Sequence, residues 1–399
     1  MQKNLLLKIL FLCLGITAVT AFMVLFLSKN IESTEEDEIP TAVVSEADNT
    51  VSASSATVNK PNADATKKEA GNGQPAIMIT PADDSSTDFD ESTLSPVPGS
   101  DSTYTPDRAE MPGIMCWGDS LTVGYLGTHS YPSLLNQWLA QDGYKCDVVN
   151  MGATGEDSRA IAARAGGIPM LLKGECIIQG DREPSDAVFV DPNGKEIHIQ
   201  LYDSVGVNPA YVTDEDGNTV EVEIYNNDIY TGYANYTVKA YEEGHLIPMK
   251  AGDEIIPYGA KIHPDYLKII YSGNNGGFSD MQEYIDQIDS IINHSGYKEF
   301  YIVIGITVPG IVDFDEYDKV MEAAYGNHYL NFRKYLAEYD YTELGYAPSE
   351  SDRNCYLHGD YSPWMMSDEL HFNDTNYSIL AQAVYEKIYE LGYNEGFYE

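Results

Sequence analysis

The stretch IMCWGDSLT, residues 114–122, joins a short apolar run to a Gly-Asp-Ser turn. An apolar run bounded by turn-forming residues is typical of a buried strand. A serine that follows such a strand and opens a helix is exposed above the edge of a sheet, where the helix N-terminus favours negative charge. Ser120 is therefore a candidate nucleophile. A structural alternative is open at this point, in which Ser120 caps a helix and Asp119 forms a turn.

The chain around this stretch alternates between apolar runs and patterns of helical period. A capping box formed by Ser279 and Gln282 is expected to begin one of the helices. Such alternation predicts a parallel sheet covered by helices on both faces, a three-layer α/β/α fold. The expected strands are residues 114–117, 146–150, 268–271, 300–308 and 328–332, and the expected helices are residues 132–142, 281–292 and 374–391.

Residues 176–262 interrupt this alternation of strand and helix patterns. They contain no convincing helical pattern, and turn signals such as Asp-Pro-Asn-Gly at 191–194 separate runs of alternating polarity. A connection of this length is too long for a loop in a compact domain. We therefore expect an inserted β-rich module at 176–262, within an α/β domain formed by residues 111–175 and 263–399.

The N-terminal part of the chain differs in composition from this domain. Residues 9–28 carry no charge, and a helix of that length would span roughly 30 Å, the thickness of a bilayer core. We expect residues 1–28 to be a membrane anchor, or alternatively a cleaved signal sequence. Lysines before the apolar run and acids after it predict an extracellular body. Residues 29–110, rich in Ser, Thr, Ala, Asp and Pro, are expected to form a disordered stalk.

The charge balance excludes one class of partner. The chain has 23 Lys and Arg against 63 Asp and Glu, a formal net charge of −40. Nucleic-acid binding is not expected, because it requires basic side chains that displace phosphate counterions. The five cysteines show no CxxC spacing and the eight histidines no HExxH spacing. We therefore expect neither a metal nor another cofactor.

Three further blocks follow other predicted strands or precede the last helix. Residues 150–155 read NMGATG, and their glycines would let a backbone N–H approach a reacting oxygen. Residues 273–275 read GNN, and an amide there could donate a second hydrogen bond to an oxyanion. Asp368 and His371 lie three residues apart, so the carboxylate can fix the tautomer of an imidazole that faces the serine.

The four blocks in this order resemble the SGNH hydrolases, a branch of the GDSL esterases and lipases. The resemblance covers residues 111–175 and 263–399 and implies a flavodoxin-like core. It also implies that Ser120 is the nucleophile, that His371 is the base and that Asp368 orients the base. The oxyanion donors that it implies are the backbone N–H groups of Ser120 and Gly152 and the side chain of Asn275, with Asn274 as the alternative amide.

These expectations combine into a membrane-anchored, extracellular serine esterase. Its expected substrates are O-acyl or O-acetyl groups on carbohydrate or cell-wall polymer. Alternatives are a lipase-like or lysophospholipase-like enzyme, an acyltransferase on the same core, and an inactive surface glycan-binding protein. The β-rich module is either a structural outgrowth or the part that recognises the polymer, through sugar stacking on Tyr225, Tyr230, Tyr233 and Tyr236.

Overall fold

The computed structural model describes residues 109–180, 185–201, 205–226, 236–244 and 246–395. The predicted anchor at 1–28 and almost all of the predicted stalk at 29–110 lie outside the described residues. In the part that is described, no helix is both long and apolar enough to cross a membrane. The short strand β1 (Ala109–Glu110) pairs in parallel with β3 (Tyr144–Lys145), so the folded body begins before Met111.

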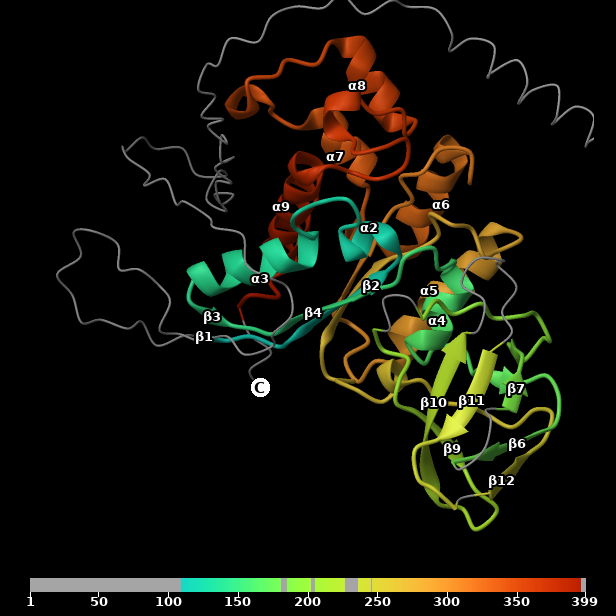
Figure 1. The fold of residues 1–399 in the computed structure, drawn as a ribbon. Helices are drawn as coiled ribbons and strands as arrows, with labels where there is room; N and C mark the ends of the chain where they lie inside the picture. Colours follow the sequence, from blue (N-terminus) through green and yellow to red (C-terminus); the bar gives the residue numbers. More distant parts are fainter. Residues whose placement is uncertain (1–108, 181–184, 202–204, 227–235, 245, 396–399) are drawn as a thin grey trace, which may run out of the picture. The chain divides into compact units, whose positions relative to one another are not determined.

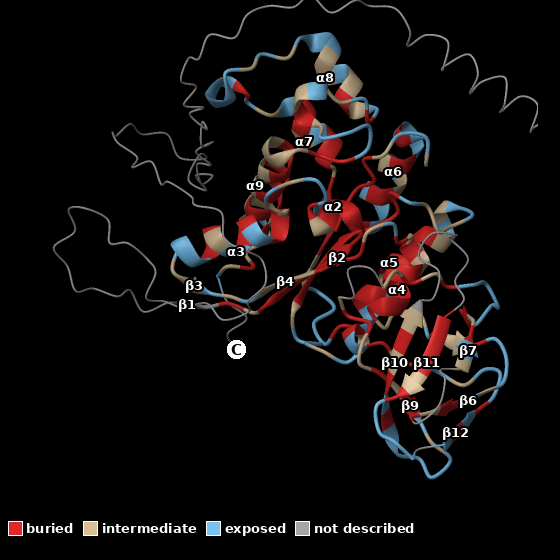
Figure 2. Ribbon diagram, in the orientation of Figure 1, coloured by how far each residue is buried: buried red, intermediate tan, exposed pale blue. Residues whose placement is uncertain are grey.

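A five-stranded parallel sheet forms the centre of the α/β domain, in the order β15-β14-β13-β2-β4. The mixed α/β fold expected from the sequence is confirmed. All of β2 and β13 is buried, as their largely apolar sequences require. Figure 2 shows this burial for β2. The strands are β2 (Ile114–Gly118), β4 (Val148–Gly152), β13 (Leu267–Tyr271), β14 (Tyr301–Ile304) and β15 (Tyr329–Leu330).

Helices cover both faces of this sheet because successive side chains of each strand point to opposite sides. Ile114 and Cys116 of β2 pack in one apolar cluster, together with side chains of α3, α7 and α9. Met115 and Trp117 pack in another, with α4, α5 and α6 (Figure 1). The described helices are α2 (Ser120–Val123), α3 (Tyr131–Gln141), α4 (Ser158–Arg164), α5 (Met281–His294), α6 (Phe314–Tyr325), α7 (Phe332–Glu338), α8 (Glu350–Leu357) and α9 (Asp374–Glu390).

The start and end of β4 and the N-cap of α5 differ from the prediction. Strand β4 starts at Val148 rather than at residue 146, and it continues to Gly152, which pairs with Gly118. Helix α5 is capped by Asp280, whose side chain accepts the N–H of Glu283 at 2.9 Å. Glu283 in turn accepts hydrogen bonds from the N–H and the Oγ of Ser279. The predicted capping box of Ser279 with Gln282 is therefore wrong by one residue.

Between α4 and β13 the chain forms short antiparallel strands with an apolar core of their own. Four of these strands make a sheet in the order β7-β11-β10-β9, and two further pairs are β12 with β6 and β5 with β8. Because β5 precedes residue 176, this β-rich segment starts earlier than predicted. Its strands are β5 (Leu171–Leu172), β6 (Cys176–Gln179), β7 (Ser185–Ala187), β8 (Phe189–Val190), β9 (Ala210–Thr213), β10 (Thr219–Asn226), β11 (Tyr236–Ala240) and β12 (Leu246–Met249).

Of the four tyrosines that could stack on sugars, the structure describes Tyr225 and Tyr236. Tyr236 is 1% exposed, its ring stacks on Phe189 inside the β-rich segment, and its hydroxyl donates to the carbonyl of Ile199. Tyr225 is half-buried and donates to the Glu223 carboxylate. Tyr230 and Tyr233 lie outside the described residues. Tyr236 is a core residue, and its predicted role in stacking is wrong.

Candidate active site

Ser120 lies directly after the carboxyl end of β2, as the first residue of the single turn α2. The turn is fixed by Asp119, whose Oδ1 accepts the N–H of Leu121 at 2.9 Å, and it ends at Gly124 in the left-handed region at φ +83°. Ser120 is only 5% exposed. A serine held between a strand end and a single helical turn has little freedom, so the position of its Oγ is set by the backbone.

A chain of hydrogen bonds links Ser120 to the loop that precedes α9. His371 Nε2 lies 3.0 Å from Ser120 Oγ, and His371 Nδ1 lies 2.9 Å from Asp368 Oδ2. The other carboxylate oxygen of Asp368 accepts the backbone N–H groups of Leu370 at 2.8 Å and of His371 at 2.6 Å. A base within reach of a hydroxyl, oriented by a carboxylate, is the arrangement that activates a serine nucleophile.

The Asp368 carboxylate stays charged in this setting. Partial desolvation acts to raise its pKa, but the hydrogen bonds from His371 and Leu370 outweigh this effect and bring the pKa down to about 2. At neutral pH Asp368 is therefore an ionised acceptor. It holds the proton of His371 on Nδ1 and leaves Nε2 free to accept the proton of Ser120.

The two asparagines after β13 have different surroundings. Asn274 is buried, and its Oδ1 accepts the N–H of Thr307 at 2.9 Å, which ties the end of β13 to the segment after β14. Asn275 is exposed, and its Nδ2 donates to the carbonyl of Glu156 at 2.9 Å. That bond uses one of the two amide hydrogens and fixes the amide plane, so the second hydrogen remains for another acceptor.

Gly152 does not occupy the position that the sequence suggested. It is buried as the last residue of β4, and its N–H already donates to Asn150 Oδ1 at 2.9 Å. A Cβ at Gly152 would lie 2.4 Å from the backbone N of Val123. The glycine therefore lets α2 pack against the end of β4, and its N–H is not free to stabilise an oxyanion.

Gly155 is the residue of this loop that the sequence reasoning missed. It is exposed, adopts φ +81° and has open space where a side chain would stand. Its N–H has no acceptor within the described residues, and the same is true of the N–H of Ser120. The second glycine of NMGATG was the available signal, but choosing it required the end of β4 to be known.

These candidate donors come together because their strands are neighbours. The loops after β13, β2 and β4 leave the same edge of the sheet, since Gly118 pairs with both Tyr271 and Gly152. Asn275 also bonds to Glu156, the residue after Gly155. Ligands of open parallel sheets bind at this carboxyl edge.

Asp119 is a buried carboxyl group next to Ser120. Burial raises its pKa to about 7, although the N–H of Leu121 and the nearby amide of Asn274 favour the charged form. The Asn274 amide does not reach hydrogen-bond geometry, and Asp119 Oδ2 has no partner among the described residues. The carboxyl group is thus poised between its neutral and charged forms near neutral pH.

A fully buried ion pair supports the loops on which Ser120 and Gly155 lie. Arg164 Nη2 lies 2.8 Å from Glu156 Oε2, and neither side chain is exposed. Arg164 also donates to the carbonyl of Gly118 at 3.4 Å and to that of Val205 at 3.0 Å. Glu156 Oε1 accepts the N–H of Gln200 at 3.0 Å. The pair therefore connects β2 and the Gly155 loop with the β-rich segment.

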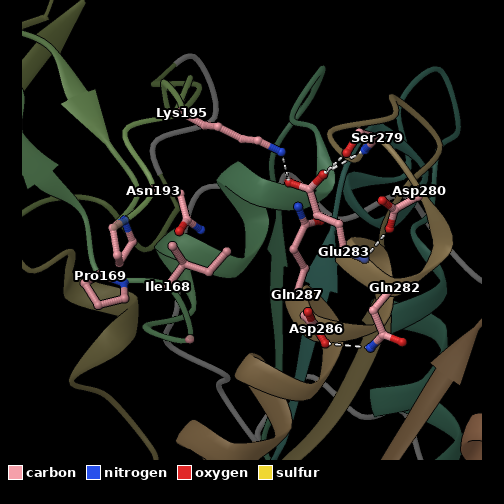
Figure 3. Close-up of a pocket in the computed structure, with 12 residues that line it drawn as sticks. Ile168, Pro169, Asn193, Lys195, Ser279, Asp280, Gln282, Glu283, Asp286 and Gln287 are labelled. Atoms are coloured by element: carbon pink, nitrogen blue, oxygen red, sulfur yellow. Dashed lines mark hydrogen bonds and ion pairs between the residues drawn. The ribbon is translucent and has the colours of Figure 1, made fainter.

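A cavity of about 570 Å³ lies elsewhere, between the β-rich segment and the start of α5 (Figure 3). Lys195 and Glu283 form an ion pair of 2.6 Å at its wall, and Arg159 reaches the same carboxylate at 2.7 Å. None of the residues that line the cavity belongs to the Ser120–His371–Asp368 chain. Of its other charged side chains, Asp280 accepts the N–H of Glu283 and Asp286 accepts the amide of Gln282, so these groups serve helix α5.

Searches for other identifying features give no assignment. In the described segments, no three or more His, Cys, Asp or Glu side chains are grouped as metal ligands. Comparison of the chain with protein-family models, with curated proteins and with solved structures finds no match.

Proposed function

We propose that the protein is a serine hydrolase that cleaves ester bonds, with an SGNH-type core. The observation that carries this proposal is the hydrogen-bonded chain from Ser120 through His371 to Asp368. These residues come from two of the blocks that resemble the SGNH hydrolases, and the α/β fold agrees with the resemblance. An inactive glycan-binding protein would not require the three side chains to be aligned in this way.

In the proposed reaction His371 Nε2 takes the proton of Ser120 as Oγ bonds to the ester carbonyl carbon. The carbonyl oxygen becomes an oxyanion, stabilised by the N–H groups of Ser120 and Gly155 and by the free amide hydrogen of Asn275. The bond between carbon and the alcohol oxygen then breaks, and His371 gives its proton to that oxygen. Water, deprotonated by His371, then attacks the acyl carbon. The bond from that carbon to Ser120 Oγ breaks, His371 returns the proton to Oγ, and the carboxylic acid leaves.

The substrate proposal follows from the N-terminal sequence. An apolar segment at 9–28 and an acidic, polar segment after it favour a body attached to the outer face of a membrane. Acyl groups on carbohydrate or cell-wall polymer are esters that such a body would meet at that location. The net charge of −40 favours neutral over anionic polymers, because like charges repel.

The proposal is tested by replacing the nucleophile in the full-length chain. Ser120→Ala should lower kcat for small acetate esters by at least about 10³-fold, because no other group forms the acyl-enzyme. Ser290→Ala, on helix α5, is the matched control and should keep wild-type activity. A folded Ser120→Ala protein with wild-type turnover would refute the assignment.

A further inference from the structure

Three large apolar side chains are exposed close in sequence to the candidate site, since Tyr125 and Leu126 follow α2 and Leu370 directly precedes His371. Tyr125 is 40% exposed, Leu126 is 53% exposed and Leu370 is 36% exposed. The Tyr125 ring lies against His371, with ring centroids 4.7 Å apart and planes tilted by 56°. We call these three residues the apolar rim. Exposed apolar groups that gather next to polar reactive groups mark binding surfaces more often than isolated ones do.

The backbone of the apolar rim is held in place from several sides. Leu126 has φ +62°, a left-handed conformation that costs a non-glycine residue energy and is found where structure around it enforces it. The carbonyl of Tyr125 accepts the hydroxyl of Tyr377 at 3.0 Å. Thr128 donates its N–H and its hydroxyl to Asp374 of α9, at 2.6 and 2.8 Å. The rim is thus fixed before any ligand arrives, which lowers the entropy lost on binding.

The chemistry of ester cleavage decides which part of a substrate meets the rim. The leaving alcohol oxygen must come within hydrogen-bond distance of His371 Nε2, because that nitrogen protonates it. The carbonyl oxygen must instead point to the loops that carry Gly155 and Asn275. The alcohol part of the ester therefore extends over His371, onto Tyr125 and its neighbours.

We propose that the apolar rim is the subsite for the alcohol part of the ester and that this alcohol is a neutral sugar ring. The inference rests on the proposed esterase function. A flat, partly exposed phenol ring fits the apolar face of a pyranose, and ring hydroxyls can reach the exposed carboxylate of Glu369. Asp368 and Glu369 directly precede Leu370, and Asp374 binds Thr128, so the negative charge near the rim repels phosphorylated or carboxylated alcohols.

The test compares two acetate esters that differ only in the alcohol. Acetate release from a mono-acetylated methyl xyloside and from ethyl acetate is measured with the full-length protein and with Tyr125→Ala. We expect kcat/KM for the sugar ester to fall about tenfold more than kcat/KM for ethyl acetate, because only the sugar loses a stacking partner. Tyr125→Phe keeps the ring and should restore the preference for the sugar ester.

Controls separate this inference from the proposed function. Tyr297→Ala removes an equally exposed tyrosine near the start of β14 and should leave both activities unchanged. The pH dependence of ethyl acetate hydrolysis should keep its shape in Tyr125→Ala, which shows that His371 still works as the base. An equal loss on both esters, or a larger loss on ethyl acetate than on the sugar ester, would overturn the sugar subsite alone. A wild-type protein that cleaves no ester would overturn the esterase proposal as well.

Discussion

Asn274 and Asn275 are neighbours in the sequence, yet they meet opposite surroundings because successive residues after a strand point to opposite sides. Asn274 turns inward and binds the N–H of Thr307, while Asn275 turns outward to the loop of Glu156. Asn274 makes a buried structural hydrogen bond through Oδ1, and its Nδ2 has no partner among the described residues. Asn275 is exposed and keeps one amide hydrogen for a ligand. The local sequence could not show which of the two asparagines donates to an oxyanion, because both side-chain amides can donate a hydrogen bond.

Replacing each asparagine separately should therefore affect different quantities. Asn275→Ala should lower kcat by about 10²–10³-fold, the usual loss for one oxyanion donor, with little change in Tm. Asn274→Ala should lower the free energy of unfolding by about 1–3 kcal/mol, because the N–H of Thr307 loses its buried acceptor. Steady-state kinetics and thermal unfolding of both variants check this. The reverse pattern would show that Asn274 is the catalytic amide.

The raised pKa of Asp119 predicts that the stability of the folded protein depends on pH. Its pKa in the folded protein, about 7, exceeds the ordinary value of 3.8, so the folded state binds more protons than the unfolded state between these values. Stability should therefore fall as pH rises from about 4 to 7. At about 1.4 kcal/mol per pKa unit, the loss due to this group is at most about 4 kcal/mol.

The Asp119→Asn variant isolates that contribution because its side chain does not titrate. The free energy of unfolding of the variant relative to wild type should rise between pH 4 and pH 7 and stay level above pH 8. Urea unfolding at several pH values measures this difference. A difference that is constant with pH would mean that the Asp119 carboxyl group is already ionised at pH 4.

At the scale of elements, the sequence predicted the strands that are apolar throughout and the helices with a clear apolar face. Predicted and observed ends of α3, α9, β2 and β13 agree within one residue. Strand β14 is shorter than predicted, because the N–H groups of Ile306 and Thr307 bond to side chains of Tyr317 and Asn274 and no longer to a neighbouring strand. Those partners lie far away in the sequence and could not be identified from it.

The sequence wrongly placed Gly152 in the loop after β4, and the cause is similar. The apolar run 146–150 suggested that β4 ends at Asn150, which placed Gly152 in the following loop. Glycine at both positions of the Gly118–Gly152 pair lets the pairing continue by two more residues while α2 packs across the strand ends. Tertiary packing therefore extended the strand beyond its apolar pattern.

The buried pair of Glu156 and Arg164 should influence activity through the positions of the loops. Arg164→Met leaves a buried, unpaired carboxylate and should destabilise the fold by about 3–5 kcal/mol. Burial already raises the pKa of Glu156, with Arg164 opposing the effect. The double variant Glu156→Leu/Arg164→Met should recover most of that stability, since an apolar pair can replace a buried ion pair.

The same double variant should keep a kcat at least about tenfold below that of wild type. It lacks the hydrogen bond from Gln200 to Glu156, which holds the Gly155 loop, and the hydrogen bond from Arg164 to the Gly118 carbonyl of β2. Thermal unfolding and steady-state kinetics give the two readouts. The control is the exposed ion pair of Lys173 and Glu196, whose charged atoms lie 2.6 Å apart. Removing this pair should change the free energy of unfolding by less than about 1 kcal/mol. Full activity in the double variant would show that the pair serves stability alone.

At the scale of the whole molecule, the candidate site depends on residues from distant parts of the chain. Ser120 and His371 are separated by 251 positions, and only the fold brings them within hydrogen-bond distance. The sequence indicated these residues because each lies in a short block with its own local pattern. It could not indicate that Gln200 and Val205 of the β-rich segment support the same site, since neither lies in any recognisable block.

Reaction of the native protein with a fluorophosphonate, which modifies only activated serines, tests the central claim most directly. The account predicts stoichiometric labelling of the full-length chain at Ser120, identified by mass spectrometry of the modified peptide. Labelling should be absent in Ser120→Ala, strongly slowed in His371→Ala and absent in the urea-unfolded chain, because activation depends on the folded arrangement. Failure of the native protein to react, or equal labelling of native and unfolded chains, would contradict it.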